Sequence, residues 1–208
     1  MKSAAQFVPP SRSLKRLRDA AAGCRGCDLY KNATQTVFGE GSPKARLVFV
    51  GEQPGDKEDL SGHPFVGPAG TLLRNAMAEA GVDPADVYLT NAVKHFKYVL
   101  KGKRRIHAKP RVIEMRACAP WLDAELRAIK PDLVVALGAT AAQAIFGSGF
   151  RLTKQRATLL ESPLAGRAIA TVHPSSILRA PDDDARHAEY KRFVADLKKI
   201  AKLSRAQG

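Results

Sequence analysis

Four short apolar runs, each followed by a helical pattern, constrain the fold of this chain most. The runs occupy residues 47–50, 86–91, 132–138 and 168–172 and are rich in Val, Ile and Leu. Amphipathic stretches alternate with them, at residues 69–80, 111–129, 139–146 and 183–203. Buried strands that alternate with helices are typical of an α/β fold with a mostly parallel sheet. We expect one three-layer α/β/α domain over residues 1–208, with a central four-stranded sheet.

Unusual polar residues stand where these runs end. Glu52 and Gln53 follow the first run, Asn91 ends the second, and His173 follows the fourth. In open α/β sheets, ligands bind outside the carboxyl ends of the strands. The sequence therefore predicts a site at this edge of the sheet.

The charge of the chain is unusual for its size. Thirty-four Lys and Arg residues against twenty Asp and Glu give a net charge of +14. Eight of the basic residues lie in residues 94–111, which we expect to be a long loop. Such a surface favours a polyanionic partner, and nucleic acid above all, although it could also serve solubility.

Three cysteines cannot all pair, which argues against an extracellular disulfide protein. The first twelve residues lack the apolar core of a signal peptide, and no apolar run is long enough to span a bilayer. We expect a soluble, intracellular protein.

The cysteine spacing indicates a metal site. Cys24 and Cys27 form a C-x-x-C pair, and Cys118 lies on a predicted helix. Thiolates at this spacing suit zinc or an iron–sulfur cluster, and His95 is available as a fourth ligand. Alternatively, the pair could be a redox dithiol, with Cys118 a buried apolar residue and His95 structural.

Several spaced motifs resemble those of the iron–sulfur branch of the uracil-DNA glycosylases. The first is GEQPGDKED at residues 51–59 followed by GHPFVGPAG at residues 62–70, and the second is HPSS at residues 173–176. The C-x-x-C pair and CAPWL at residues 118–122 resemble the cluster-binding segments. The likeness runs from about residue 20 to residue 200, with the motifs in the family's order.

Two departures resemble the UdgX subgroup in particular. His95 stands in TNAVKH where most of the branch has a cysteine, and an inserted basic loop carries KRRIH at residues 103–107. The resemblance implies a [4Fe–4S] cluster held by Cys24, Cys27, His95 and Cys118. It also implies that His107 attacks the sugar and leaves the protein covalently bound to DNA.

The resemblance assigns the base pocket to residues near the strand ends. Phe65 would stack on the extruded uracil beside Gly51, and Asn91 and Gln53 would bind its polar groups. His173 would stabilise the negative charge on uracil O2. Glu52 would stabilise the cationic sugar or activate a nucleophile. On the residues alone, Phe65 could be core and Asn91 an ordinary turn residue.

The basic loop has two interpretations. Lys103, Arg104 and Arg105 disfavour a second positive charge nearby, so they should keep the attacking His107 ring neutral, and we count Arg105 with the catalytic group. Alternatively the loop only binds phosphates, with His107 a bystander.

For DNA, we expect contacts from Lys103, Arg104, Ser175 and Arg179. Ile177 could be a wedge into the base stack or helix core.

The favoured hypothesis is a uracil-excising protein that ends cross-linked to single- or double-stranded DNA. The alternatives are a conventional turnover glycosylase, in which Glu52 activates water, and a non-enzymatic damage-sensing module. The resemblance implies a monomer in the bacterial cytosol.

Overall fold

The central sheet of the computed structural model, which describes residues 2–205, has six strands rather than the expected four. Its order is β1-β3-β2-β6-β8-β7. The four expected strands are its parallel centre: β2 (Leu47–Gly51), β3 (Val87–Asn91), β6 (Leu133–Leu137) and β8 (Gly166–Thr171). Two short antiparallel strands, β1 (Glu40–Gly41) and β7 (Leu159–Ser162), form the edges.

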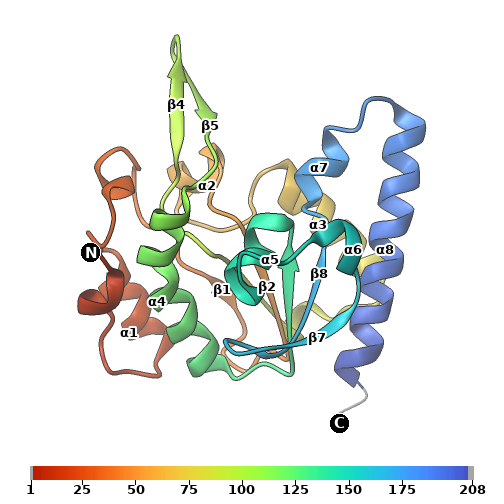
Figure 1. Ribbon diagram of the computed structural model, residues 1–208, viewed down its shortest axis with the longest axis horizontal. Coiled ribbons are helices and arrows are strands. Elements are labelled where there is room, and N and C mark those ends of the chain that lie inside the picture. The colour runs from red at the N-terminus through yellow and green to blue at the C-terminus, as the bar shows by residue number, and fades with distance from the viewer. Residues whose placement is uncertain (1, 206–208) are drawn as a thin grey trace.

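Helices cover both faces of this sheet (Figure 1). On one face, Phe49, Val135 and Ile169 pack with side chains of α3 (Pro68–Glu79), α7 (Pro174–Leu178) and α8 (Asp183–Arg205). On the other face, Val48, Val134 and Ala170 pack with α4 (Val112–Ile129) and α5 (Ala139–Phe146). The prediction of a three-layer α/β fold with a mostly parallel central sheet is confirmed.

A third apolar cluster lies on the side of α4 that faces away from the sheet, where α1 (Leu14–Ala21) packs against α4. The remaining short elements are α2 (Asp56–Ser61), α6 (Leu152–Gln155) and three 3-10 turns at Ala4–Phe7, Asp28–Lys31 and Pro84–Asp86. No helix within residues 2–205 has the length and apolarity that a membrane crossing requires.

The expectation of a long loop at residues 94–111 is wrong. The segment contains a hairpin of β4 (Tyr98–Lys101) and β5 (Arg104–His107), which projects from the body of the protein (Figure 1). Gly102 supplies its turn with a φ of 60°, a conformation that glycine adopts without strain. Because basic residues dominate this segment, its sequence pattern did not indicate the two short strands, which face solvent.

The strand order changes direction between β2 and β6. From β2 the chain proceeds to β3 on one side, and later to β6 and β8 on the other. Adjacent parallel strands whose connections leave in opposite directions form a crevice at their carboxyl ends. This crevice receives the side chains that follow β2, β3, β6 and β8.

Candidate active site

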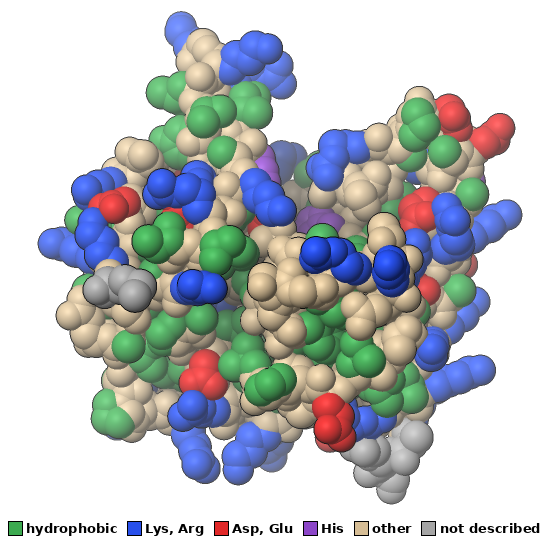
Figure 2. Space-filling view, viewed as in Figure 1, with side chains coloured by type: hydrophobic (Ala, Val, Ile, Leu, Met, Phe, Trp, Pro, Cys, Tyr) green, Lys and Arg blue, Asp and Glu red, His purple; other side chains and the backbone are tan. Residues whose placement is uncertain are grey.

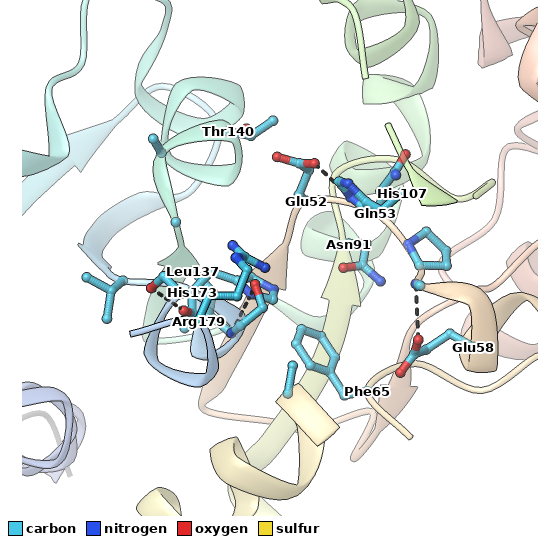
Figure 3. A pocket seen from close by; sticks show the side chains of 18 of the residues that line it. Glu52, Gln53, Glu58, Phe65, Asn91, His107, Leu137, Thr140, His173 and Arg179 are labelled. Atoms are coloured by element: carbon cyan, nitrogen blue, oxygen red, sulfur yellow. Dashed lines mark hydrogen bonds and ion pairs between the residues drawn. The ribbon is translucent and has the colours of Figure 1, made fainter. Parts of the chain in front are cut away.

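A cavity of about 740 Å³ lies at the carboxyl ends of the parallel strands (Figure 3). Its lining brings together many of the predicted site residues, from segments far apart in sequence. Those residues are Glu52, Gln53, Phe65, Asn91, His107, His173, Ser175 and Arg179. The open crevice between the hairpin and α7 is visible in the space-filling view (Figure 2).

Glu52 and His107 form the central contact of this cavity. His107 Nε2 lies 3.2 Å from Glu52 Oε1, with the histidine half exposed and the carboxylate mostly covered (Figure 3). Burial raises the pKa of Glu52, but hydrogen bonds from His107 and Thr140 outweigh it, so the pKa falls below its ordinary value. At neutral pH, Glu52 is therefore an ionised carboxylate that holds the ring.

The electrostatic environment of His107 differs from the prediction that cations surround it. Arg105 does not line the cavity, because its guanidinium binds Asp56 and Asp59, each at 2.6 Å, and lies over the rings of Phe96 and Tyr98. Its charge is thus compensated by α2, and the charge nearest to His107 is the carboxylate of Glu52.

Gln53 also has a different neighbourhood from the one predicted. Its amide nitrogen donates to the carbonyls of Lys97 and Ala108, and its amide oxygen accepts from the N–H of Lys97. These residues are the two ends of the hairpin. The side chain of Gln53 therefore holds the hairpin root, and both of its N–H donors are used there rather than for a ligand.

Phe65 forms one wall of the cavity in a strained conformation. Its φ is 56°, which is uncommon for a residue with a large side chain. Arg74 Nη1 binds the Phe65 carbonyl at 2.8 Å, and a Cβ on Gly70 would lie 1.7 Å from that oxygen. Phe65 is 6% exposed and packs in the core while it also lines the cavity. Its position therefore agrees in part with both interpretations, a pocket wall and a core residue.

Asn91 lies at the end of β3 and depends on Gly51 for its space. A Cβ on Gly51 would lie 2.3 Å from Asn91 Oδ1 and 2.8 Å from the Phe65 ring. Beneath it, Lys94 Nζ binds the Asn91 main-chain carbonyl at 2.7 Å. Gly51 thus allows an amide and an aromatic ring to meet at one side of the cavity.

His173 caps α7, and its partners determine its tautomer. The N–H of Ser175 donates to His173 Nδ1 at 3.1 Å, so the ring proton lies on Nε2. Burial lowers the pKa of His173 to about 4. At neutral pH this residue is a neutral imidazole with a hydrogen-bond donor at Nε2.

The lowered pKa of His173 predicts a pH-dependent stability. As pH falls from the ordinary value of 6.5 to about 4, the unfolded chain takes up a proton that the folded chain does not. The free energy of unfolding should fall across this window, by about 3 kcal/mol at its lower end, and not above it. Chemical denaturation from pH 7 to 4 measures this slope. Burial also lowers the pKa of His95 to about 4, so His95 adds a similar contribution, and His173→Gln should reduce the slope by about half. His187→Gln, at an exposed position on α8, should leave the slope unchanged; equal slopes in all three proteins would refute the assignment.

The predicted DNA contacts are only partly positioned for that role. Ser175 and Arg179 line the cavity, and Lys103 and Arg104 are at or beside the hairpin turn, largely exposed. Ile177 is fully buried in the core, so its interpretation as a wedge is wrong. The short helix α7 turns Ile177 inward and exposes its neighbour Leu178 at 38%.

Among the cavity residues that were missing from the sequence prediction, Glu58 and Thr140 make polar contacts that shape the site. Glu58 accepts hydrogen bonds from the N–H groups of Gly55 and Gly67, and so joins the loop after β2 to the loop of Phe65. Thr140, near the start of α5, contacts Glu52. The position of Glu58 within the first motif was a usable signal, but nothing in the sequence linked Thr140 to Glu52.

The three cysteines lie together in the apolar cluster between α1 and α4. All are buried, and the Trp121 indole N–H points at Cys24 Sγ from 3.1 Å, while the Lys94 N–H points at Cys118 Sγ from 3.3 Å. Across residues 2–205, no three or more His, Cys, Asp or Glu side chains are grouped to hold a single metal ion. Buried thiols that receive N–H donors nonetheless match the donor chemistry of an iron–sulfur cluster.

His95 has the protonation that a metal ligand requires. The Thr36 hydroxyl donates to the Ala21 carbonyl, so it must accept from His95 Nε2, 2.9 Å away. Burial lowers the pKa of His95 to about 4, which leaves Nδ1 with its lone pair. A hydrogen bond to the second ring nitrogen is the usual companion of a histidine ligand.

Comparison with known proteins gives consistent results. Residues 38–198 match the family described as the uracil DNA glycosylase superfamily. The chain is 37% identical over 187 residues to the Type-4 uracil-DNA glycosylase of Thermotoga maritima, covering 89% of this chain and 91% of that protein. It is 38% identical to the Type-4 enzyme of Archaeoglobus fulgidus, covering 86% and 87%, and 34% identical to that of Sulfurisphaera tokodaii, covering 92% and 85%.

Proposed function

The chain belongs to the uracil-DNA glycosylase superfamily, and we propose that it excises uracil from DNA and then captures the sugar through His107. One observation carries the second part of the proposal: His107 lies 3.2 Å from Glu52 inside the cavity. In the proposed reactive form the ring is neutral, the Glu52 carboxylate accepts the hydrogen of Nε2, the nitrogen that faces it, and the lone pair lies on Nδ1. A neutral, oriented imidazole is a competent nucleophile.

We propose that the extruded uracil binds at the opposite side of the same cavity. In the proposed complex, Phe65 stacks on the ring and the Asn91 amide binds its edge, beside the space that Gly51 leaves. The Nε2–H of His173 donates to uracil O2. This hydrogen bond strengthens as the C1′–N1 bond breaks and negative charge develops on the base. It therefore stabilises the transition state more than the ground state.

The proposed capture step balances without water. The bond from C1′ to N1 breaks, its electron pair leaves with uracil, and a bond forms from C1′ to the ring nitrogen of His107. Glu52 balances the positive charge that arises first on the sugar and then on the imidazole. The leaving uracil anion takes up a proton from solvent, and the protein stays joined to the DNA.

Conventional hydrolysis is the second candidate. Glu52 is ionised and its side chain keeps 21% of its surface exposed, so it could also activate a water molecule. Incubation with uracil-containing single-stranded DNA, followed by a denaturing gel and quantification of free uracil, separates the two. Capture gives at most one uracil per protein and a slow-migrating band that resists detergent and heat. Hydrolysis gives many uracils per protein and no band, and no release at all would refute both.

We propose further that Cys24, Cys27, Cys118 and His95 hold a [4Fe–4S] cluster. Their burial, the N–H donors at two of the sulfurs and the available His95 Nδ1 support this donor set. When bound, the cluster would fix the loop of Cys24 and Cys27 to α4 through Cys118. Iron and acid-labile sulfide analysis of the purified protein tests it, and a colourless protein with one zinc would overturn it.

The proposed DNA substrate also bears on the phosphate contacts and on the place where the protein acts. We propose that Arg179 and Ser175 at the cavity, with Lys103 and Arg104 on the hairpin, bind phosphates on either side of the uracil. DNA is a cytoplasmic substrate in bacteria, so this would be the site of action. The proposed working form is a monomer.

Arg105 should be a positioning residue for His107 rather than a catalytic one. Its bonds to Asp56 and Asp59 tie β5 to α2, two residues before His107. Arg105→Ala should slow cross-linking about tenfold, because the ring loses its fixed position, while uracil excision changes less. Single-turnover time courses of both products measure this split. Arg104→Ala, beside the hairpin turn, is the matched control and should keep the wild-type rate at saturating protein; unchanged cross-linking in Arg105→Ala would contradict the assignment.

A further inference from the structure

The β4–β5 hairpin exposes aliphatic side chains that the proposed chemistry does not use. Val99, Leu100 and Ile106 are 58%, 68% and 40% exposed. Val99 is paired with Ile106, so these two share one face of the hairpin, and Leu100 is paired with Arg105 on the other. Soluble proteins seldom expose such a group without a partner.

The hairpin is held rigidly at its root. The N–H of Ala108 donates to the Lys97 carbonyl at 3.0 Å, the Gln53 amide bridges the same two residues, and Arg105 ties the hairpin to α2. Beyond this root, each four-residue strand extends about 13 Å into solvent. The exposed aliphatic side chains are therefore carried by a fixed projection at the rim of the cavity.

The charge of the hairpin selects the kind of partner. Lys101, Lys103 and Arg104 lie at its turn, and residues 97–109 contain no Asp or Glu. In Figure 2, basic side chains lie at the end of this projection, with apolar ones beneath them. A second copy of this chain, with a net charge of +14, is a poor partner for such a surface.

We propose that the hairpin is a DNA-binding finger, whose aliphatic side chains lie against unstacked bases and sugars beside the uracil. The proposal rests on the proposed function, because the finger stands at the rim of the cavity that would receive the base. Apolar side chains on both faces suit insertion between parts of one flexible strand, which exposes the apolar faces of its bases. A closed duplex hides these faces by stacking.

The test uses conservative variants of the complete protein. Val99→Thr/Ile106→Thr preserves β-branching at both positions and removes only one methyl group, at residue 106, so the strands should keep their pairing. Fluorescence anisotropy measures affinity for a labelled, uracil-free single strand and for its duplex. The double variant should bind the single strand about tenfold more weakly and lose less than about threefold on the duplex. Leu100→Thr, on the opposite face, should lose about threefold on the single strand.

A matched control and two further measurements keep the test decisive. Val112→Thr/Ile113→Thr changes residues of similar exposure on α4, 53% and 58%, and should bind as wild type does. Equal losses in control and finger variants, or no loss, would overturn the proposal. So would a dimeric wild type that becomes monomeric in the finger variant during sedimentation. Because the strand lacks uracil, failure of the wild type to release uracil would refute the proposed function alone.

Discussion

His107→Ala should form no detergent-resistant complex with uracil-containing DNA, while the wild type should convert fully to a one-to-one complex. The reason is that His107 is the only imidazole that Glu52 contacts among the described residues of the cavity, and Thr140, which also bonds Glu52, offers only a weakly nucleophilic hydroxyl. We expect a loss of at least about a hundredfold in covalent product, measured on a denaturing gel at single turnover. A cross-link that persists in this variant would refute the capture step.

His107→Ser and His107→Gly extend this prediction. Each removes the ring and leaves room for water beside Glu52, so uracil release should continue and exceed one molecule per protein. His63→Ala is the matched control, because His63 also pairs with a carboxylate, Glu40, at 2.6 Å on the surface. That variant should cross-link as the wild type does. If the Ser and Gly variants release no uracil, His107 acts in excision as well as in capture.

Glu125→Ala should destabilise the protein by about 3–5 kcal/mol, the largest stability change that we expect. The carboxylate of Glu125 is fully buried on α4 and pairs with the equally buried Lys94. It also accepts hydrogen bonds from Tyr88, Thr90 and the N–H of Gly39. Its removal leaves a buried ammonium without a counter-charge and several donors without an acceptor. Urea denaturation at neutral pH measures the loss.

Two variants test the reason for this loss. Asp123→Ala removes a carboxylate from the same helix, where it pairs with Arg127 at the surface, and should change stability by less than about 0.5 kcal/mol. Lys94→Met/Glu125→Leu removes both buried charges and should recover much of the stability. Because Lys94 also binds the Asn91 carbonyl, the double variant should still bind uracil-containing DNA more weakly. A Glu125→Ala protein as stable as Asp123→Ala would contradict the argument.

The sheet and most of the cavity could be predicted because both follow from periodic patterns. Four buried runs with polar residues at their ends determine a parallel sheet, and parallel strands bring Glu52, Asn91 and His173 to one edge. Position alone could not say what each side chain contacts. Gln53 follows Glu52 directly, yet its amide binds the hairpin root, which appeared in the sequence only as a basic stretch.

Other differences arise from packing that the sequence does not encode locally. Ile177 and Leu178 are adjacent aliphatic residues, and the orientation of α7 alone decides that the first is core and the second exposed. The pairing of Lys94 with Glu125 was likewise not predictable, because the two residues are separated by 31 positions and each resembles an ordinary surface charge in the sequence. Arg105 was grouped with its basic neighbours because the two aspartates that neutralise it lie on α2, far from β5 in the sequence.

The closed root of the hairpin has an evolutionary consequence. Since Lys97 and Ala108 are hydrogen-bonded to each other, the intervening segment begins and ends at nearly the same point in space. Ancestral proteins could therefore gain or lose this segment as one module, without changing the register of the sheet or the wall formed by Phe65 and Asn91. The proposed capacity to retain the DNA after excision would then be an accessory acquired by insertion, added to a base pocket that was already complete.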